Sequence, residues 1–507
     1  MFQRRRFYLR YISILLFLGI TACAGPARPN NPPVPTIVDT QTPVIQETPI
    51  PTPSPTLSPT QDPTPTPAAP QRTKYTIDAV LDYNKHHLQV EEKIHYTNHS
   101  SDPLNELILM VDPLYFPGTF KLDRLEYGDG KPLPEPQQEN GWLRFPLSLP
   151  LLPGDTIDLS LAYQLNLPSP VPSAATRPIP FGYTERQTNL VDWYPFIPPY
   201  ISEQGWLAHP ASYYGEHLVY EKSDFAVNIR LSDPQPNLII AASAPVLQDG
   251  EWYRFQHDNA RNFAWSISPY YQTQTAQAGP VKVTTYAFSG QEKASQAVLT
   301  TTVEALELYS KLFGEYPRQS LNVVEADFLD GMEYDGMYFL SKGFYNLYTG
   351  TPGEYLVAIA AHETAHQWWY AMVGNDQALE PWLDEALCTY MEHIYFENLH
   401  PEALDWWWTY RINYYQPRGW VDDSIYNPHG EIQAYRAYRN AVYLNGAVFL
   451  DELRKTMGDQ AFFEFLKAYA AQNRDQIATK NSFFSLANQF SQSDLMPLIK
   501  QYFYHSE

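Results

Sequence analysis

The residues best suited to chemistry lie in the segment His362-Glu363-Thr364-Ala365-His366. On a helix, residues four apart share one face, so His362 and His366 can bind one ion at about 2.0–2.1 Å while Glu363 faces a water on that ion. The spacing therefore predicts a site in which zinc activates water for hydrolysis. The alternative is a helix that carries these polar residues incidentally.

Glu385 is the candidate for the third protein ligand of a catalytic zinc site, whose fourth position stays open for water. It lies in Trp382-Leu383-Asp384-Glu385-Ala386, and eighteen residues separate it from His366. Two roughly antiparallel helices joined by a turn of that length would bring Glu385 beside the histidines. We therefore expect one zinc ion per chain, bound by His362, His366 and Glu385; a solvated acid on a helix surface is the alternative for Glu385.

This pattern resembles the signature of the M1 aminopeptidases, His-Glu-x-x-His, eighteen residues and Glu. The run from Trp382 to Tyr390 is similar to the family's Trp-Leu-Asn-Glu-Gly-Phe-Ala-x-Tyr. Upstream, Asp330-Gly331-Met332-Glu333-Tyr334 is similar to Gly-Ala-Met-Glu-Asn, and downstream Tyr443-Leu444-Asn445-Gly446-Ala447 resembles Tyr-x-Lys-Gly-Ala. Four ordered blocks make the resemblance specific over roughly Lys74 to the C-terminus. Its departures, which bear on substrate choice more than on chemistry, are Asp330, Tyr334 and Asn445.

The resemblance implies the catalytic roles. Glu363 would act as the general base toward the zinc-bound water and would later deliver the proton to the leaving amine. The tetrahedral intermediate carries an oxyanion that needs a donor besides zinc. Tyr443 would supply that donor, and Tyr438 is the alternative.

The resemblance also implies a substrate site. Glu333 would bind the α-ammonium group of the substrate, because a buried carboxylate is the efficient partner of a desolvated cation. Met332 and Gly331 would lie beside it. The implied function is a zinc-dependent aminopeptidase that hydrolyses N-terminal residues from peptides with a free N-terminus. The alternatives are a zinc endopeptidase, a catalytically inactive surface lipoprotein of the same fold that acts as a binding module, and an epoxide-hydrolysing variant, which has no support in the sequence.

The elements that would position these residues change type along the chain. Period-two alternation at 75–83 and 88–96 predicts a β-hairpin, and similar alternation at 157–163 and 225–231 predicts further strands. Residues 74–278 are therefore expected to form an N-terminal all-β sandwich domain.

Helical periodicity begins after this domain. Helices are expected at 291–313, 382–397, 443–457 and 460–471, with a strand at 321–325. The histidine helix is expected to start at Thr351 as N-cap, with Pro352 at its first position and Glu354 closing a capping box, and to run to Val373 before Gly374. The fold class is thus α+β and multidomain. By resemblance, residues 279–507 form a mostly helical thermolysin-like zinc-peptidase domain, in a short form without the large C-terminal helical domain of many family members.

An aromatic segment follows the predicted ligand helix. It contains Trp406-Trp407-Trp408, Tyr410, Tyr414 and Tyr415. Such a run is more typical of helix packing than of a substrate pocket.

The N-terminus indicates export. Three arginines at 4–6, an apolar run and Ile20-Thr21-Ala22-Cys23 predict a signal peptide at 1–22, and the last four residues resemble a bacterial lipobox with Cys23 as the lipidated residue. An ordinary signal peptide is the alternative. Residues 23–73 are rich in Pro and Thr and are expected to be a linker. The protein is therefore expected to be extracytoplasmic and anchored to a bacterial membrane by the lipid on Cys23.

Charge and cysteine content narrow the function further. The chain has 34 Lys and Arg residues against 56 Asp and Glu residues, a net charge of -22, which argues against nucleic acid as a partner. Cys23 and Cys388 are the two cysteines. If Cys23 carries lipid, Cys388 has no partner for a disulfide, so the fold must be stabilised by packing.

Overall fold

The computed structural model describes residues 71–169, 179–233, 236–426 and 435–506. The expected signal peptide (1–22), the expected lipid site at Cys23 and nearly all of the expected linker (23–73) lie outside these residues. By its internal contacts the chain divides after residue 68, and the described residues belong to the second unit, Ala69–Glu507. Within the described residues, no helix combines the length and the apolarity that a membrane span requires.

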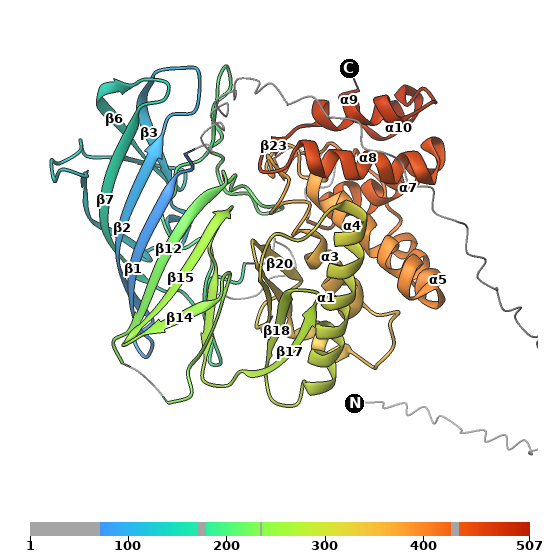
Figure 1. Ribbon diagram of the computed structural model, residues 1–507, viewed down its shortest axis with the longest axis horizontal. Helices are drawn as coiled ribbons and strands as arrows, with labels where there is room; N and C mark the ends of the chain where they lie inside the picture. Colours follow the sequence, from blue (N-terminus) through green and yellow to red (C-terminus); the bar gives the residue numbers. More distant parts are fainter. Residues whose placement is uncertain (1–70, 170–178, 234–235, 427–434, 507) are drawn as a thin grey trace, which may run out of the picture. The chain divides into compact units, whose positions relative to one another are not determined.

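A seven-stranded sheet dominates the N-terminal region (Figure 1). The expected hairpin lies at its centre, where β1 (Lys74–Asp82) and β2 (His87–Thr97) run antiparallel, with Tyr75 opposite Ile94. Strand β1 also pairs in parallel with β12 (Ser223–Leu231), a segment far away in the sequence. The strand order is β14-β15-β12-β1-β2-β7-β4, and the other members are β4 (Phe120–Tyr127), β7 (Thr156–Asn166), β14 (Val246–Asp249) and β15 (Trp252–Ala260).

Two smaller sheets share the hydrophobic core of the large sheet, since Leu107, Phe145 and Ile267 belong to the same buried cluster as Ile77. The β-rich N-terminal architecture expected from the alternation is thus confirmed. The three-stranded sheet contains β3 (Leu104–Met110), β6 (Trp142–Leu151) and β5 (Gln137–Glu139). The four-stranded sheet contains β13 (Ile239–Ala242), β16 (Trp265–Ser268), β9 (Thr188–Leu190) and β8 (Gly182–Tyr183). Shorter elements are η1 (Asp112–Tyr115), β10 (Tyr200–Ile201) and β11 (Gly205–Trp206).

A five-stranded sheet joins the N-terminal region to the helices. Its order is β17-β18-β19-β21-β20, and the strand expected at 321–325 is β19. The boundary that we placed between residues 278 and 279 falls where β17 ends and the turn to β18 begins. That domain boundary stays a prediction. Strand β20 forms an edge of the sheet and pairs only with β21 among the described strands. The bounds are β17 (Gln272–Ala278), β18 (Val281–Ala287), β19 (Ser320–Ala326), β20 (Gly331–Tyr334) and β21 (Met337–Ser341).

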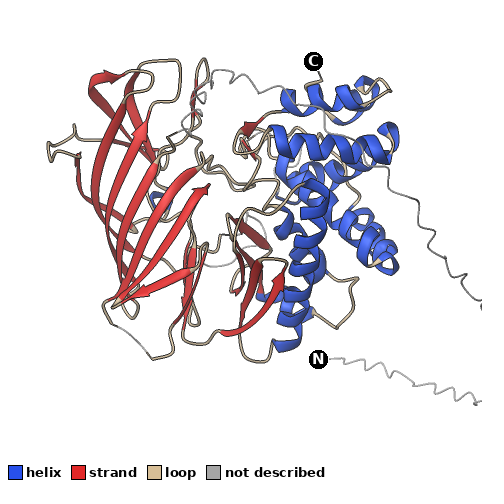
Figure 2. Cartoon of the chain, in the orientation of Figure 1, coloured by secondary structure: helices blue, strands red, loops and turns tan. Residues whose placement is uncertain are grey.

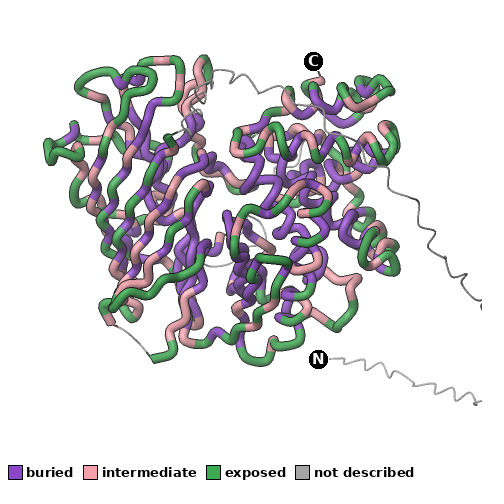
Figure 3. The backbone as a smooth tube through the Cα atoms, viewed as in Figure 1, coloured by how far each residue is buried: buried purple, intermediate pink, exposed green. Residues whose placement is uncertain are grey.

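The C-terminal region is mostly helical (Figure 2). Helix α1 (Glu292–Phe313) ends before Gly314, whose φ of 110° favours glycine. It packs on β17, β18 and α3, while α4 (Trp382–Leu399) packs on α3 and α7. The residues of α3 and α4 are almost all buried (Figure 3). The remaining elements are α2 (Lys342–Leu347), η2 (Pro401–Ala403), α5 (Leu404–Trp406), η3 (Trp407–Ile412), η4 (Asn413–Tyr415), α6 (Tyr435–Arg439), η5 (Asn440–Asn445), α7 (Gly446–Met457), α8 (Asp459–Gln472), α9 (Lys480–Phe490), α10 (Met496–Tyr502), β22 (Gly374–Asn375) and β23 (Ile477–Ala478).

The histidine helix begins later than we predicted. Helix α3 spans Tyr355–Ala365, and its N-cap is Glu354. The predicted capping box at Thr351 is therefore wrong. The Glu354 carboxylate instead accepts hydrogen bonds from the backbone N–H groups of Thr349, Gly350 and Thr351, at 2.8, 3.1 and 2.9 Å. These bonds hold the loop before the helix rather than the first turn of the helix.

The predicted extension of this helix to Val373 is also wrong. The carbonyl oxygens of Tyr370 and Ala371 accept hydrogen bonds from Nε of Arg261, at 2.8 and 3.3 Å, and Tyr370 has a φ of 144°. The positive φ of Tyr370 is incompatible with a continuing α-helix. A side chain from the β-rich region therefore holds the segment that follows α3.

Candidate active site

The three expected ligands lie together. Nε2 of His362 is 3.2 Å from Nε2 of His366 and 3.2 Å from Oε2 of Glu385, and Nε2 of His366 is 3.6 Å from the same oxygen. Three ligand atoms of a tetrahedral ion with bonds of about 2.1 Å would be separated by about 3.4 Å. The three atoms therefore fit a zinc ion without rearrangement.

Each of the two histidines is oriented by another group. Nδ1 of His362 lies 3.0 Å from Oε1 of Glu392, and Nδ1 of His366 lies 3.1 Å from the carbonyl oxygen of Trp369. Glu392 accepts hydrogen bonds from Nε1 of Trp407 at 2.9 Å and from the guanidinium of Arg411 at 2.7 and 2.8 Å. Such outer contacts fix the tautomer and the ring orientation of a metal-binding histidine.

The pKa values reflect this crowding of charge. Burial lowers the pKa of His362, but hydrogen bonds to Glu385 and Glu392 outweigh it and raise that pKa to about 9. Burial raises the pKa of Glu385, but hydrogen bonds from His362 and His366 lower it to about 2. Because zinc binds neutral imidazole, metal binding to this protein is expected to release protons.

Glu363 is placed for general-base chemistry. It lines the same cavity as the three ligands, and its Oε2 is buried without a hydrogen-bond partner. A Cβ atom at Gly331 would lie 2.0 Å from Oε1 of Glu363, so a larger residue at this position would displace the carboxylate from where it stands. Burial raises the pKa of Glu363 well above its usual range. The charges of His366 and His362 oppose this rise, and those of Glu333 and Glu385 add to it.

Tyr443 contacts two of the expected ligands. Its hydroxyl donates to Oε1 of Glu385 at 2.7 Å, and its ring is parallel to that of His362. It belongs to the π-helical turn η5, a rare geometry that is frequent at functional sites. The alternative, Tyr438, is fully buried, does not line this cavity and packs against Gly215.

The substrate residues implied by the resemblance also line the cavity. Its volume is about 320 Å³, and Gly331, Met332 and Glu333 form one wall. Oε1 of Glu333 accepts a hydrogen bond from Nε2 of Gln377 at 3.1 Å. Oxygen and nitrogen atoms of Glu333, Glu363 and His366 lie within 4.8 Å of one another.

Two residues of this site were not found from the sequence. Glu216, from the β-rich region, lines the cavity with Glu333, and Glu392 supports His362. No local motif marks Glu216, since the chain brings it to the site across more than a hundred residues. Glu392 lies seven residues after Glu385, two helical turns along α4, so that spacing was a usable signal.

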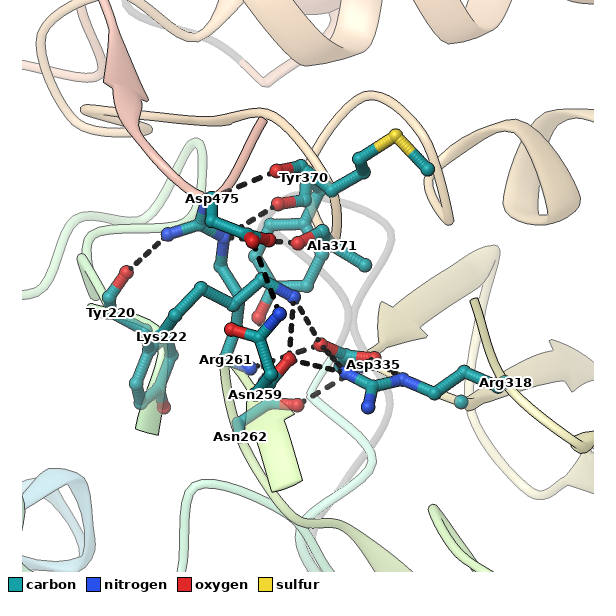
Figure 4. Close-up of polar contacts among 12 residues, drawn as sticks. Tyr220, Lys222, Asn259, Arg261, Asn262, Arg318, Asp335, Tyr370, Ala371 and Asp475 are labelled. Atoms are coloured by element: carbon teal, nitrogen blue, oxygen red, sulfur yellow. Dashed lines mark hydrogen bonds and ion pairs between the residues drawn. The ribbon is translucent and has the colours of Figure 1, made fainter. Parts of the chain in front are cut away.

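A second cluster of buried charges lies just beyond β20 (Figure 4). The Asp335 carboxylate accepts hydrogen bonds from Arg318 at 2.8 and 2.9 Å, from Lys222 at 3.0 Å and from the backbone N–H of Arg261 at 3.0 Å. Arg261 itself donates to carbonyl oxygens of Tyr370, Tyr220 and Gln476. This cluster joins the β-rich region to the end of α3.

Fold and site together define a zinc-metallopeptidase type of domain, with two histidines and a general base on one helix and a third ligand on the next. Residues 297–502 match the model of the peptidase family M1 domain. The expected resemblance to this family is thus confirmed for that segment.

Known aminopeptidases match parts of the chain. Human endoplasmic reticulum aminopeptidase 2 is 24% identical over 248 residues, which are 46% of this chain and 25% of that protein. The probable aminopeptidase 2 of Sulfurisphaera tokodaii is 25% identical over 155 residues, which are 29% of this chain and 20% of that protein. The matched segments therefore span a quarter or less of the length of these relatives.

Solved structures match more of the chain. The M1 zinc metallopeptidase from Deinococcus radiodurans superposes with a TM-score of 0.60 at 16% identity, over 85% of this chain and 93% of that chain. A variant of the Deinococcus radiodurans M1 zinc metallopeptidase bound to a Tyr-Ser-Ala substrate gives a TM-score of 0.58 at 16% identity, over 85% and 93% of the two chains. At this identity the likeness shows the fold, a β-rich region followed by a helical peptidase domain.

Proposed function

We propose that this protein is a zinc-dependent aminopeptidase that hydrolyses N-terminal residues from peptides. The zinc ion, when bound by His362, His366 and Glu385, supplies an activated water and polarises the scissile carbonyl group. Glu363 takes the proton of that water and passes it to the leaving amine, and the Tyr443 hydroxyl donates to the developing oxyanion. The aminopeptidase relatives and the peptide-bound M1 structure support peptides as the substrate class.

One observation favours removal of N-terminal residues over internal cleavage. In the part of the chain that the structure describes, Glu333 and Glu216 lie at the end of the cavity that adjoins a small space of about 20 Å³. The two arginines of the cavity wall are paired with other acids, Arg411 with Glu392 and Arg439 with Asp330. This end therefore offers the carboxylate of Glu333 to a cation from the substrate and leaves little room for further residues, as binding of an α-ammonium group requires.

Substrates with and without a free α-amine test this proposal. We expect hydrolysis of leucine p-nitroanilide and of short free peptides, no hydrolysis of their N-acetylated forms, and loss of activity with a chelator that zinc restores. Glu333→Ala should lower kcat/KM for free-amine substrates about a hundredfold, because the substrate cation would be desolvated without a partner. Glu307→Ala, which removes an exposed acid from α1, is the matched control.

Other outcomes identify the alternatives. Equal cleavage of acetylated and free peptides, with Glu333→Ala as active as the unaltered protein, would mean a zinc endopeptidase. Binding of zinc and peptide without any turnover would mean a catalytically inactive binding module.

We propose further that the enzyme is held outside the cytoplasm by lipid on Cys23. The lipobox-like Ile20-Thr21-Ala22-Cys23 and the Pro/Thr-rich segment that follows support this. Mass spectrometry of the N-terminal peptide should find an acylated Cys23. Cys23→Ala should move the protein from the membrane fraction to the soluble fraction; an unmodified Cys23 in membrane-bound protein would contradict the proposal.

A further inference from the structure

An open groove continues from the catalytic cavity at the end away from Glu333. The groove has a volume of about 590 Å³, and it shares Phe344, Tyr355 and Tyr415 with the cavity. We call it the aromatic groove and define it by six of its lining residues: Leu347, Tyr355, Trp406, Tyr410, Tyr414 and Tyr415. From the sequence we had predicted that the aromatic segment at 406–415 packs between helices. Trp407 does pack in the buried core, whereas Trp406 lines the groove.

The walls of the aromatic groove are ordered by their own contacts. The Tyr355 hydroxyl lies 3.0 Å from the Tyr415 hydroxyl and donates to the carbonyl oxygen of Tyr410 at 3.0 Å. The rings of Tyr355 and Trp406 meet edge to face at 5.4 Å. The groove is therefore built before any ligand enters it, which lowers the entropy cost of binding.

Apolar side chains stand exposed along the groove. Leu347 is 77% exposed, Tyr414 is 71% exposed and Tyr410 is 55% exposed. Glu354, the one carboxylate among the described residues that line the groove, accepts hydrogen bonds from Thr349 and Thr351 in the loop before α3. Clustered exposed apolar surface beside a catalytic cavity marks a binding site for apolar groups.

We propose that the aromatic groove binds the downstream part of a peptide substrate and selects oligopeptides with an aromatic or bulky apolar side chain there. This inference rests on the proposed function, because it places the substrate N-terminus at Glu333. The peptide can then continue only away from the closed end, toward Tyr355 and Tyr415. Continuity with the cavity favours the substrate as occupant over a second copy of the chain.

The helix geometry gives the position of the selected residue. Tyr355 and His362 are both on α3, seven residues apart, which is about 10 Å along the helix axis. An extended peptide covers that distance in about three residues. The selected side chain is therefore the third or a later residue after the scissile bond, which is the fourth residue of the substrate or beyond.

A set of hexapeptides tests this selection. Each has N-terminal leucine and otherwise alanine, with one phenylalanine moved from the second to the sixth position. We expect kcat/KM to rise about tenfold or more when phenylalanine reaches the fourth to sixth position, since burial of an aromatic side chain contributes at least that factor.

Two variants locate the effect in the groove. Leu347→Ser and Tyr414→Ser should reduce the ratio of kcat/KM for the phenylalanine-containing hexapeptide to kcat/KM for leucine p-nitroanilide about tenfold. Leu149→Ser is the matched control, because Leu149 is 80% exposed on β6 of the β-rich region. It should leave the ratio unchanged. A flat positional profile, or a profile that Leu347→Ser does not alter, overturns the proposal.

A binding measurement separates this proposal from the proposed function. Fluorescence anisotropy of the labelled hexapeptides with the Glu363→Gln variant reports affinity without turnover. If no substrate is cleaved but the fourth-position phenylalanine still tightens binding about tenfold, and Leu347→Ser abolishes the gain, the groove stands and the aminopeptidase function falls. Equal affinities for all hexapeptides, or a change of oligomeric state in Leu347→Ser seen by sedimentation, would assign the groove to another occupant and overturn the inference.

Discussion

Two buried carboxylates two residues apart, Glu333 and Asp335, lie in opposite electrostatic surroundings. Asp335 is surrounded by Arg318, Lys222 and a backbone N–H, and although burial raises its pKa, these cations hold that pKa far below its usual range (Figure 4). Glu333 faces the cavity, and burial raises its pKa, with the charge of Glu385 adding to the rise while His366 opposes it.

The difference separates a structural acid from a site acid. The charge of Asp335 is balanced by cations that the folded chain itself provides. Among the described residues that line the cavity with Glu333, acids outnumber arginines and lysines, and a metal ion and a substrate ammonium group would add positive charge from outside. Excess buried negative charge beside a cavity is therefore the electrostatic sign of this site.

The largest effect expected from this comparison concerns Glu363. Glu363→Gln keeps the shape of the side chain but removes the base, so kcat should fall by about 10²- to 10⁴-fold. Bound zinc, measured by metal analysis, and the thermal midpoint should stay the same, because Glu363 is neither a ligand nor part of an ion pair with a fixed cation. A variant with bound zinc and more than a tenth of the original kcat would show that another group is the base.

The next effect concerns stability rather than rate. Asp335→Asn would leave Arg318 and Lys222 buried without an opposing charge, so the free energy of unfolding should fall by about 3–5 kcal/mol in urea denaturation. Glu333→Gln is the matched contrast, since it removes a charge that has no fixed cation and should not lower stability. If both variants are equally destabilised, the distinction between structural and site acids fails.

The smallest expected effect is on stability and concerns a third buried acid, Glu92, which we compare with Asp335 and Glu333. Glu92 lies in the core of the β-rich region on β2, is 1% exposed and has no well-formed hydrogen bond at either carboxylate oxygen. Burial raises its pKa well above the usual value, and Tyr163 partly opposes the rise. Glu92 is absent from the cavity walls described above, so an unbalanced acid marks a site only when a ligand can reach it.

The sign of the pH effect at Glu92 follows from proton binding. Because the pKa is higher in the folded state, the folded protein holds more protons than the unfolded chain above about pH 4.5, and stability falls as pH rises toward the folded pKa. Glu92→Gln cannot lose a proton, so its stability relative to the unaltered protein should increase by about 1–2 kcal/mol between pH 5 and pH 8. Urea denaturation at the two pH values measures this change. A stability difference that does not change with pH would mean that Glu92 is charged in the folded protein as well as in the unfolded chain.

The sequence by itself determined the features that depend on local periodicity. The four-residue spacing of His362 and His366 requires one helix face, and the alternation in 75–96 requires a hairpin, because side-chain direction repeats with a fixed period in each element. The eighteen-residue interval to Glu385 was enough to predict the third ligand. All three ligand atoms come together as expected, although the metal itself stays a prediction.

Only the tertiary structure decided the features that depend on distant segments. Arg261, from the β-rich region, donates to the carbonyl groups of Tyr370 and Ala371, in the segment where we had predicted that α3 would continue. Glu216 reaches the cavity and Trp406 lines the aromatic groove through packing between elements. No local pattern encodes such contacts, since they depend on which surfaces meet when the sheets and helices pack. The same residue types would be equally compatible with a closed core.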